Sequence, residues 1–412
     1  MFTVVISVKE KTPQMNSATP AALHKICGKE VIKWVVSAAK KTAAKRIIIS
    51  AEDKELYSYL AENSDIEIFK PCEAAKELTS ENQSGNIVVI NAETPLITAK
   101  TIEGAVKLKE ERGFAAAASV SGQAGRIYVF ADAALACAPE RINEMTPFCE
   151  AANSAALCAI DKENAVIRTY TVSDECELKL IENRIDLSEV SEIMQERINR
   201  FHMLNGVTLI NPSSTFIGAD VTIGRDTIIY PNTVLSGKTK IGSNCVIEME
   251  SKIEDSVLAD NVSVTSSVIL KSEIGEGTSV GPFAYVRPGS TVGKDVKVGD
   301  FVELKNVTVG DGTKISHLTY LGDSDIGKNV NFGCGTVTCN YDGKDKFRSV
   351  IGDGVFVGCN TNFVSPVNVG DGAYIAAGST ITEDIPQDTL AIARARQVNK
   401  DGWNGNKYSK KF

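Results

Sequence analysis

Histidine is scarce in this 412-residue chain, which contains only His24, His202 and His317. Three scattered imidazoles argue against a histidine-rich metal site. Basic residues are not in excess either, because 52 Asp and Glu against 44 Lys and Arg give a net charge of −8. A general binder of nucleic acid or anionic membranes needs a basic surface, so the composition argues against both. No apolar run approaches the ~18–20 residues that a membrane span requires.

Cysteine is present but unorganised, because the ten cysteines form no C-x-x-C pair and no Cys/His cluster. We therefore expect most of them to be small buried apolar residues in a reducing compartment. The first strand-like run, residues 2–8, is too short for a signal peptide and is followed by charges. These absences predict a cytoplasmic protein.

Before residue 205, short β-branched runs alternate with helical stretches. This alternation predicts a mostly parallel sheet covered by helices. The expected strands are 2–8, 46–50, 66–69, 86–91 and 117–120, and the expected helices are 29–41, 53–62 and 99–111. Apolar residues then recur at helical spacing from 186 to 204, where Asp186 and Glu189 resemble a capping pair. A connecting helix is predicted there.

After residue 205, aliphatic residues recur every six positions, and glycine follows several of them. A six-residue period gives each face of a triangular coil one short strand and one turn, with the aliphatic side chain inside and Gly or Asn in the turn. The pattern predicts a left-handed parallel β-helix, from which residues 338–349 loop out because they break the register. The predicted inward positions are Ile217, Ile223, Ile229, Leu235, Ile241, Ile247 and Ile253, then after one slip Val262, Val268, Ile274, Val280, Val286, Val292, Val298 and Leu304, and finally Ile351, Val357, Phe363, Val369, Ile375 and Ile381.

Four longer motifs in the second half carry a family resemblance. They are 281–288 (GPFAYVRP), 301–305 (FVELK), 317–323 (HLTYLGD) and 338–343 (TCNYDG). Over essentially its whole length the chain resembles the bacterial bifunctional N-acetylglucosamine-1-phosphate uridyltransferase and glucosamine-1-phosphate acetyltransferase family. The resemblance implies a nucleotidyltransferase-like (Rossmann-like) α/β domain in 1–185, a linker helix in 186–204, a β-helix acetyltransferase domain in 205–395 and a tail in 396–412.

His317 is the only histidine of the repeat region and lies in the densest motif. Acetyl transfer to an amine needs a base that takes the amine proton and donors that stabilise the thioester oxyanion. A lone histidine is more often structural, but the neighbouring motif residues Glu303 and Tyr320 favour a functional one. The resemblance implies that His317 is the general base and that Glu303 assists it.

Three cations, Arg287, Lys305 and Lys346, stand among apolar repeats and in the out-looped segment. A solvated charged face would explain them, but such a set also suits a sugar phosphate, which Arg can grip bidentately. The resemblance assigns them that role, with Tyr320 and Asn331 on the sugar. It places the co-substrate acetyl-CoA against Cys334, Asn340, Tyr341, Cys359, Ala377 and Arg394. Neither cysteine has a base in its own motif, which argues against a thiol nucleophile.

The first half departs from the family where phosphate chemistry would take place. The family's loop L-x-x-G-x-G-T-R-M reads SVKEKTPQM in residues 7–15, and the lysine of the following S-x-x-P-K is also lost. Glycines let the backbone approach phosphates and cations grip them, so these losses predict a degenerate uridyltransferase domain. Glu93 and Glu182 stand at the family's magnesium positions, and magnesium is expected only if this domain is active. The replaced loop positions are Glu10, Thr12, Gln14 and Ala21.

These features predict a two-domain enzyme that transfers acetyl from acetyl-CoA to glucosamine 1-phosphate, for UDP-N-acetylglucosamine and cell-wall synthesis. Two rivals fit the same residues: a fully bifunctional enzyme that also uses UTP, and a catalytically silent regulatory homologue. Another amino-sugar phosphate as acceptor and a retained affinity of the first domain for UTP or UDP-sugars also stay open. The flat faces of the coil and its sparse site predict a homotrimer without nucleic-acid or membrane partners. The basic tail either packs on a neighbour or is a solvated terminus.

Overall fold

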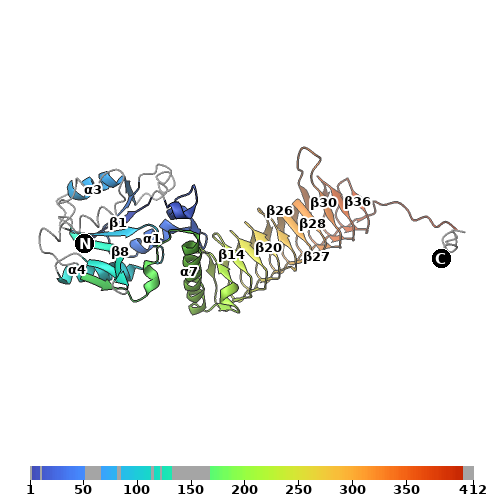
Figure 1. Ribbon diagram of the computed structural model, residues 1–412. Coiled ribbons are helices and arrows are strands. Elements are labelled where there is room, and N and C mark those ends of the chain that lie inside the picture. The colour runs from blue at the N-terminus through green and yellow to red at the C-terminus, as the bar shows by residue number, and fades with distance from the viewer. Residues whose placement is uncertain are drawn as a thin grey trace, which may run out of the picture. The chain divides into compact units, whose positions relative to one another are not determined.

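The computed structural model describes residues 2–9, 12–51, 66–80, 85–112, 116–120, 123–131 and 168–401 (Figure 1). The chain divides into two compact units, Met1–Ile198 and Asn199–Phe412, and each is described by itself. None of the helices in the described ranges is both long and apolar enough to cross a membrane.

The first unit is built on a seven-stranded sheet. In sheet order its strands are β5 (Glu67–Phe69), β4 (Arg46–Ser50), β1 (Phe2–Ser7), β6 (Asn86–Asn91), β8 (Gln123–Ala131), β7 (Ala116–Val120) and β9 (Arg168–Thr171). β5, β4, β1 and β6 run parallel, whereas β8 is antiparallel to both of its neighbours. The mostly parallel sheet is thus confirmed, and each predicted strand lies within one residue of its expected bounds.

Helices α1 (Val31–Lys40) and α4 (Ala99–Arg112) pack on one face of this sheet, where alternate apolar residues of β1 and β6 form a buried core. Helix α1 begins later than predicted because Lys29–Glu30 forms β3, which pairs with β2 (Lys25–Ile26). Helix α3 (Pro71–Ser80) was not expected, and the predicted helix 53–62 lies outside the described residues. Short 3₁₀ turns complete the unit at η1 (Pro13–Met15), η2 (Ala21–Leu23) and η3 (Glu175–Leu178).

The connecting helix is α7 (Arg184–Leu204), and its N-terminus is capped by a different pair from the one expected. The side chain of Asn183 accepts hydrogen bonds from the N–H groups of Ile185 and Asp186, at 2.8 and 3.0 Å. The Asp186 carboxylate accepts in return from the N–H of Asn183 at 3.1 Å. This is a reciprocal capping box one turn earlier than predicted, whereas Glu189 pairs with Lys179 instead.

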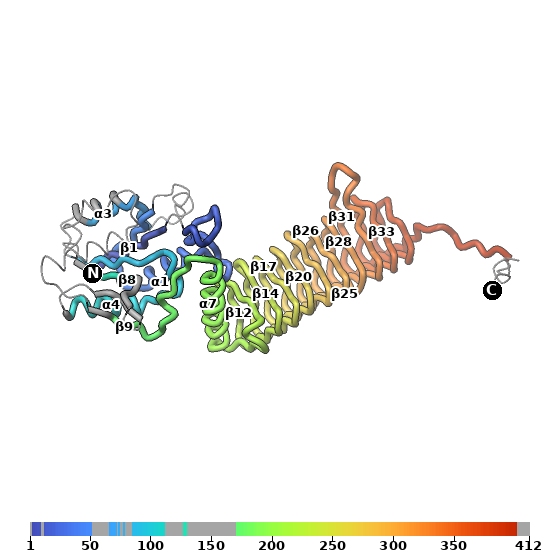
Figure 2. The backbone as a smooth tube through the Cα atoms, in the orientation of Figure 1, coloured from blue at the N-terminus to red at the C-terminus, as the bar shows by residue number. Residues whose placement is uncertain are grey.

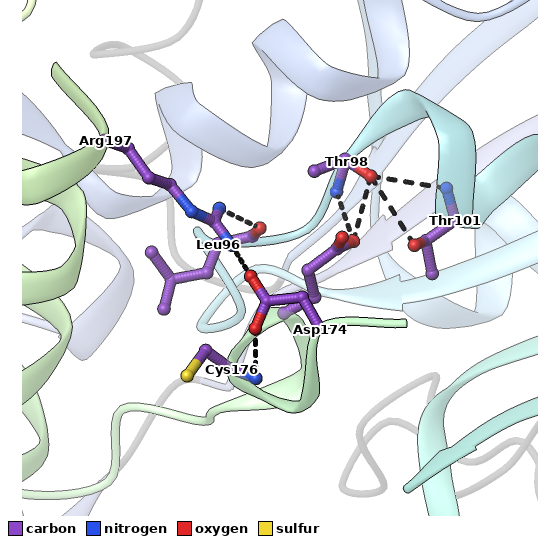
Figure 3. Close-up of polar contacts among 7 residues, drawn as sticks. Leu96, Thr98, Thr101, Asp174, Cys176 and Arg197 are labelled. Atoms are coloured by element: carbon purple, nitrogen blue, oxygen red, sulfur yellow. Dashed lines mark hydrogen bonds and ion pairs between the residues drawn. The ribbon is translucent and has the colours of Figure 1, made fainter. Parts of the chain in front are cut away.

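Further along α7, Arg197 ties the helix to the rest of the first unit (Figure 3). Its guanidinium donates to the Leu96 carbonyl at 2.6 Å and to the Asp174 carboxylate at 2.8 Å. The other oxygen of Asp174 accepts from the N–H of Cys176 at 3.0 Å, so one carboxylate links helix and loop.

The second unit is a left-handed parallel β-helix, as predicted (Figure 2). One face is an eleven-stranded sheet: β10 (Thr208–Leu209), β13 (Ile228–Ile229), β16 (Val246–Ile247), β19 (Ser263–Val264), β22 (Ser279–Val280), β25 (Lys297–Asp300), β27 (Lys314–His317), β29 (Asn331–Phe332), β32 (Phe356–Val357), β35 (Tyr374–Ile375) and β37 (Leu390–Ala391). The turn η4 (Pro212–Ser214) lies near its start.

The other two faces join into one seventeen-stranded sheet because β26 and β28 continue around a corner. Its strands are β11 (Phe216–Ile217), β12 (Thr222–Ile223), β14 (Val234–Ser236), β15 (Lys240–Ile241), β17 (Lys252–Glu254), β18 (Val257–Leu258), β20 (Val268–Leu270), β21 (Glu273–Ile274), β23 (Tyr285–Val286), β24 (Thr291–Val292), β26 (Glu303–Val309), β28 (Tyr320–Ile326), β30 (Val337–Cys339), β31 (Ser349–Ile351), β33 (Asn362–Val364), β34 (Asn368–Val369) and β36 (Thr380–Ile381).

The aliphatic repeat lines the inside of the coil: Leu235, for example, pairs with Ile217 and Ile253 of the neighbouring coils, and all three are buried. The predicted register is wrong in two strands. Ile269 and not Val268 is buried in β20, and in β19 the residue that pairs with Ile247 is Val264, whereas the predicted Val262 is buried just before that strand. Some turns are one residue shorter than the hexapeptide rule assumes, and this shifts the inward position by one. Left-handed Asn residues occupy several corners, as expected: Asn232, Asn244, Asn261, Asn329 and Asn360.

Residues 340–348 project from the coil between β30 and β31, at the predicted place (Figure 2). A bridge between Tyr341 and Lys346 closes this projecting loop. Arg348 anchors its base, donating twice to the Asp325 carboxylate, at 2.6 and 2.5 Å, and once to the Asn306 carbonyl at 3.0 Å.

Six cysteines have described side chains, and all six are free thiols, but the expectation that most are buried is wrong for them. Cys245 is buried, Cys339 and Cys359 are exposed, and the other three are partly buried. Cys339 is the last residue of β30, and Cys359 lies in the turn after β32.

Candidate functional site

His317 ends strand β27 at a corner of the coil, with its side chain 55% exposed. Its register partner on the preceding coil is Asp300, and the two side chains meet, with Nδ1 of His317 2.5 Å from Oδ1 of Asp300. The hydrogen bond with His317 lowers the pKa of Asp300, so this carboxylate is ionised at neutral pH. The pair leaves the other ring nitrogen, Nε2, available to accept a proton.

The expected partner of His317, Glu303, lies just past this corner and contacts a different side chain. Its carboxylate accepts from the Arg287 guanidinium at 2.8 Å, and Arg287 also lies over the Tyr285 ring. The hydrogen bond that Arg287 donates to Glu303 raises the pKa of Arg287 further, so the cation is permanent. The assisting role of Glu303 toward His317 stays a prediction.

The three predicted phosphate ligands gather on the same side of the corner. Lys305 follows Glu303 on β26, and Lys346 of the projecting loop lies beside it. The neighbouring Lys346 ammonium, followed by burial, lowers the pKa of Lys305. Arg287 adds to this repulsion. Three adjacent cations that repel one another form a place where an anion would be stabilised.

Tyr320 and Asn340 contact each other close to these cations. Asn340 is buried and donates to the Asp323 carboxylate at 2.5 Å, and it also bonds the Tyr320 phenol. Burial raises the pKa of Tyr320, so the phenol keeps its proton and can donate it in a hydrogen bond. Gly322 makes the arrangement possible, because a Cβ there would lie 2.5 Å from the Tyr320 oxygen and 2.8 Å from the Asn340 nitrogen.

Four of the six predicted acetyl-CoA residues, Cys334, Cys359, Ala377 and Arg394, form a column of corners that continues from His317, whereas Asn340 and Tyr341 lie outside it. The N–H of Asn360 bonds the Cys334 carbonyl at 2.7 Å, and the N–H of Gly378 bonds the Cys359 carbonyl at 2.8 Å. Ala377 and Arg394 follow, both exposed. The floor of the column is glycine, since a Cβ at Gly333 would lie 2.5 Å from the Cys359 nitrogen and one at Gly358 would lie 2.4 Å from the Ala377 nitrogen.

Asn331, in β29, lies on the same sheet as His317, while Tyr341 lies in the projecting loop. The site residues of the coil thus form two groups on the two sides of one corner: the histidine and the column on one side, and the cations with Tyr320 on the other. One chain brings the members of each group together.

In the first unit, the predicted magnesium positions lie at the carboxyl ends of β1 and β6. The strand order reverses between these two parallel strands, which is where α/β sheets bind ligands. The backbone N–H of Lys9 donates to Glu93 at 3.1 Å, and its ammonium lies 3.5 Å from Glu182. Glu93 is completely buried, and burial raises its pKa to about 7.

These residues do not fit a magnesium site. Mg²⁺ usually keeps several waters and needs carboxylates that solvent can reach, whereas Glu93 has no exposed surface and its second oxygen has no partner among the described residues. The Lys9 ammonium already supplies positive charge beside both acids. Within the described ranges, no group of three His, Cys, Asp or Glu side chains could hold a metal ion.

At the positions where the family's loop has its arginine and lysine, this chain places no charge. Gln14 is exposed and uncharged, and Ala21 is completely buried. Glu10 lies outside the described residues. Lys9, within the same loop, faces the two acids, and Arg184 lies beside His24 at 3.3 Å.

Sequence reasoning missed two residues that matter in this geometry, Asp300 and Gly322, and it missed the contact between Lys9 and Glu182. The repeat offers a signal for Asp300, because this residue precedes His317 by one coil. Steps of five and six residues alternate in this region, however, so the spacing of six does not identify which residues are opposite each other. Gly322 belongs to the motif 317–323, but the motif does not indicate that this residue lies against Tyr320 and Asn340. Lys9 meets Glu182 only through tertiary structure, and no sequence signal links them.

Two family models match the second unit. The model described as the GMPPB C-terminal domain matches residues 210–298, and the bacterial transferase hexapeptide model, of six repeats, matches residues 348–383. Among solved structures, a nucleotidyl transferase from Methanothermobacter is 11% identical, with a TM-score of 0.40, and covers 48% of this chain and 99% of its own. A UDP-N-acetylglucosamine acyltransferase from Francisella novicida is 17% identical, with a TM-score of 0.33, and covers 44% of this chain and 66% of its own.

Curated relatives match nearly the whole chain. The bifunctional protein GlmU of Clostridium acetobutylicum is 40% identical, over 95% of this chain and 96% of its own. That of Clostridium novyi is 39% identical over 99% of both chains, and that of Thermoanaerobacter pseudethanolicus is 40% identical over 95% of this chain and 94% of its own. Identity at this level over both units shows the family, and the chain belongs to the bifunctional GlmU proteins.

Proposed function

We propose that the second unit transfers acetyl from acetyl-CoA to the amine of glucosamine 1-phosphate, which yields N-acetylglucosamine 1-phosphate for UDP-N-acetylglucosamine and cell-wall synthesis. The observation that carries this proposal is the pairing of His317 with an ionised carboxylate, at the end of a glycine-floored column and next to a cluster of cations. The reaction needs three parts: a base, a surface that holds the thioester and a site for the phosphate. His317, the column and the cation cluster would provide them.

In this reaction the amine nitrogen attacks the thioester carbonyl while Nε2 of His317 takes a proton from that nitrogen. The carbonyl opens to a tetrahedral oxyanion, which collapses and breaks the carbon–sulfur bond. The proton then passes from His317 to the departing sulfur, so that amide and free CoA thiol are the products. Backbone N–H groups of the column could stabilise the oxyanion.

The cation cluster orients the acceptor. Arg287, Lys305 and Lys346 would bind the phosphate dianion and thereby relieve their own repulsion, while Tyr320 and Asn331 bind the sugar. These groups would bind any amino-sugar phosphate. Glucosamine 1-phosphate is our choice within that class because curated relatives at about 40% identity carry the GlmU name.

The test is thiol release from acetyl-CoA in the presence of glucosamine 1-phosphate. His317→Ala should lower kcat by about 10²–10⁴-fold, the usual contribution of a general base, without loss of the β-helix circular dichroism. His24→Ala, in the other unit, is the matched control and should leave the rate unchanged. Near-full activity of His317→Ala would refute the assignment, and the absence of thiol release by the wild type would favour a silent regulatory homologue.

We propose further that the first unit does not form UDP-N-acetylglucosamine. Uridylyl transfer must neutralise charge that develops on the UTP phosphates, which takes a divalent metal, cations and close backbone N–H groups. The buried Glu93, the neutral Gln14 and the buried Ala21 support the loss of these groups. Incubation with UTP, N-acetylglucosamine 1-phosphate and Mg²⁺ should release no pyrophosphate. Sustained turnover in the ordinary enzyme range of about 1–10³ s⁻¹ would restore the bifunctional interpretation.

We infer that the working form is a homotrimer in the cytoplasm. Phe283, Phe301 and Leu318 form an exposed apolar ladder directly beside Asp300 and His317, and the first two rings stack at 5.4 Å between centroids. An apolar ladder beside a site with two separated groups favours neighbouring copies that complete the site. The free thiols of the six cysteines with described side chains are consistent with a reducing compartment.

A further inference from the structure

The geometry points to Asp300 as the residue that positions His317, by accepting the Nδ1 proton and directing Nε2 toward the reacting amine. This inference rests on the proposed acetyl transfer. The Asp300 carboxylate is engaged by Nδ1 of His317, so we assign it as a positioning residue that acts through the imidazole.

The contact is built into the coil by the backbone. Asp300 ends β25 and His317 ends β27, and the two residues are register partners in adjacent parallel strands. The N–H of Leu318, the residue after His317, bonds the Asp300 carbonyl at 2.9 Å. Backbone hydrogen bonds and the side-chain contact therefore hold Asp300 and His317 opposite each other. Both residues lie in regular strands, so no flexible segment is needed to bring the imidazole to the carboxylate.

The carboxylate also selects the tautomer. An ionised carboxylate can only accept, so Nδ1 must carry the proton and Nε2 must present its lone pair. Glu303, the other acid of the motif region, is held by Arg287 at 2.8 Å. Of the two acids, Asp300 is the one placed to stabilise the imidazolium that forms when His317 takes the amine proton.

The positive charge of Lys297, close to the pair, also favours the ionised form of Asp300. Lys297 lies on the same strand as Asp300 and, after the hydrogen bond from His317 and a backbone hydrogen bond, contributes to the lowered pKa of this carboxyl. Gly299 allows the Ser316 carbonyl to approach next to the pair, since a Cβ at Gly299 would lie 1.9 Å from that carbonyl oxygen. Strand β27 thus packs closely against β25 at the position of the pair.

The first experiment is kinetic and uses the full chain. Asp300→Asn keeps the size of the side chain but can orient the ring either way. It should lower kcat by about 10- to 100-fold and leave the KM values for both substrates within about threefold. Asp295→Asn changes an exposed acid on the same coil and should leave kcat unchanged. A kcat of Asp300→Asn within twofold of wild type would overturn the inference.

The second experiment reads the tautomer and needs no activity. With only three histidines in the chain, ¹⁵N-histidine labelling gives three ring systems, which His24→Gln and His202→Gln assign. The neutral His317 ring should carry its proton on Nδ1 in the wild type and in Glu303→Gln, and should lose this preference in Asp300→Ala. An unchanged tautomer in Asp300→Ala would overturn the inference. If His317→Ala kept its activity while the tautomer followed Asp300, the proposed function would fail and the positioning contact would stand.

Discussion

Gly322 lacks a side chain where Tyr320 and Asn340 meet, and this single position links packing to substrate binding. A Cβ would come within 2.5 Å of the phenol oxygen, closer than van der Waals contact allows. The phenol is the end of a ring fixed between neighbouring coils, so it would have to move away from the proposed sugar position.

We therefore expect Gly322→Ala to raise the KM for the amino-sugar phosphate by about tenfold, while the KM for acetyl-CoA stays within twofold. Steady-state kinetics with each substrate varied in turn provide the measurement. Gly218→Ala is the matched control, because its Cβ would meet neighbours only at 3.4 Å and beyond. Equal effects of the two variants would show that the change acts on the coil as a whole.

Glu93 is the residue at which charge and fold are most directly linked. Burial raises its pKa to about 7 from an ordinary value of 4.5. The folded state therefore keeps a proton that the unfolded chain has lost between about pH 4.5 and 7. Stability falls as pH rises through that window and levels off above it, because the folded state binds more protons there.

Glu93→Gln removes this titration, and we expect its unfolding free energy to be flatter than that of the wild type between pH 5 and 7.5. The reporter is Trp34, which lies in α1 of the same unit, in a Trp403→Phe background, with urea as denaturant. Glu192→Gln, exposed on α7, should keep the wild-type profile. Parallel profiles for wild type and Glu93→Gln would show that Glu93 does not titrate in this range.

At the scale of the element, one side chain anchors the base of the projecting loop of residues 340–348 to the coil. Arg348 binds Asp325 with two parallel hydrogen bonds and also reaches the carbonyls of Asn306 and Ser324. Such a bidentate contact holds geometry better than a single ion pair does. The loop carries Lys346 to Lys305, so its anchoring controls the cation cluster.

Arg348→Gln should loosen the loop without unfolding the coil. We expect trypsin to cleave after Lys344 or Lys346 several-fold faster, and the KM for the amino-sugar phosphate to rise by about tenfold. Arg225→Gln makes the same substitution at an exposed position of an earlier coil and should change neither quantity. Faster cleavage without a change in KM would separate loop mobility from phosphate binding.

At the scale of the whole molecule, the association of chains is the main expectation. Phe283, Phe301 and Leu318 are each more than half exposed and adopt left-handed backbone angles, which bulky side chains rarely do. An exposed apolar ladder of this kind is unfavourable in water and would be stabilised by contact with other copies.

Light scattering should give a mass of three times the 44.1 kDa of one chain, and Phe301→Glu should shift it toward the monomer with loss of acetyl transfer. Phe216→Glu replaces an equally exposed ring on the first coil and should leave the trimer intact. A wild-type chain that is active as a monomer at assay concentration would contradict this expectation.

The repeating part of the fold could be predicted from the sequence because a parallel coil converts a linear period directly into inward and outward positions. Ile217, Leu235 and Ile253 are buried for that reason alone. The alternating first unit was similarly readable, since strand and helix periods differ. Glycine and asparagine at corners added a local conformational signal that needs no knowledge of distant residues.

Only the tertiary structure decided which side chains meet. The Asp300–His317 contact depends on where the coil shortens by one residue. The Lys9–Glu182 contact joins residues from the beginning and the end of the sequence of the first unit. The exchange of Val268 for Ile269 inside β20 has the same origin. Local periodicity fixes the direction in which a side chain points within its own turn, whereas a pairing across turns depends on the accumulated length of every turn between them, and a difference of one residue changes the partner.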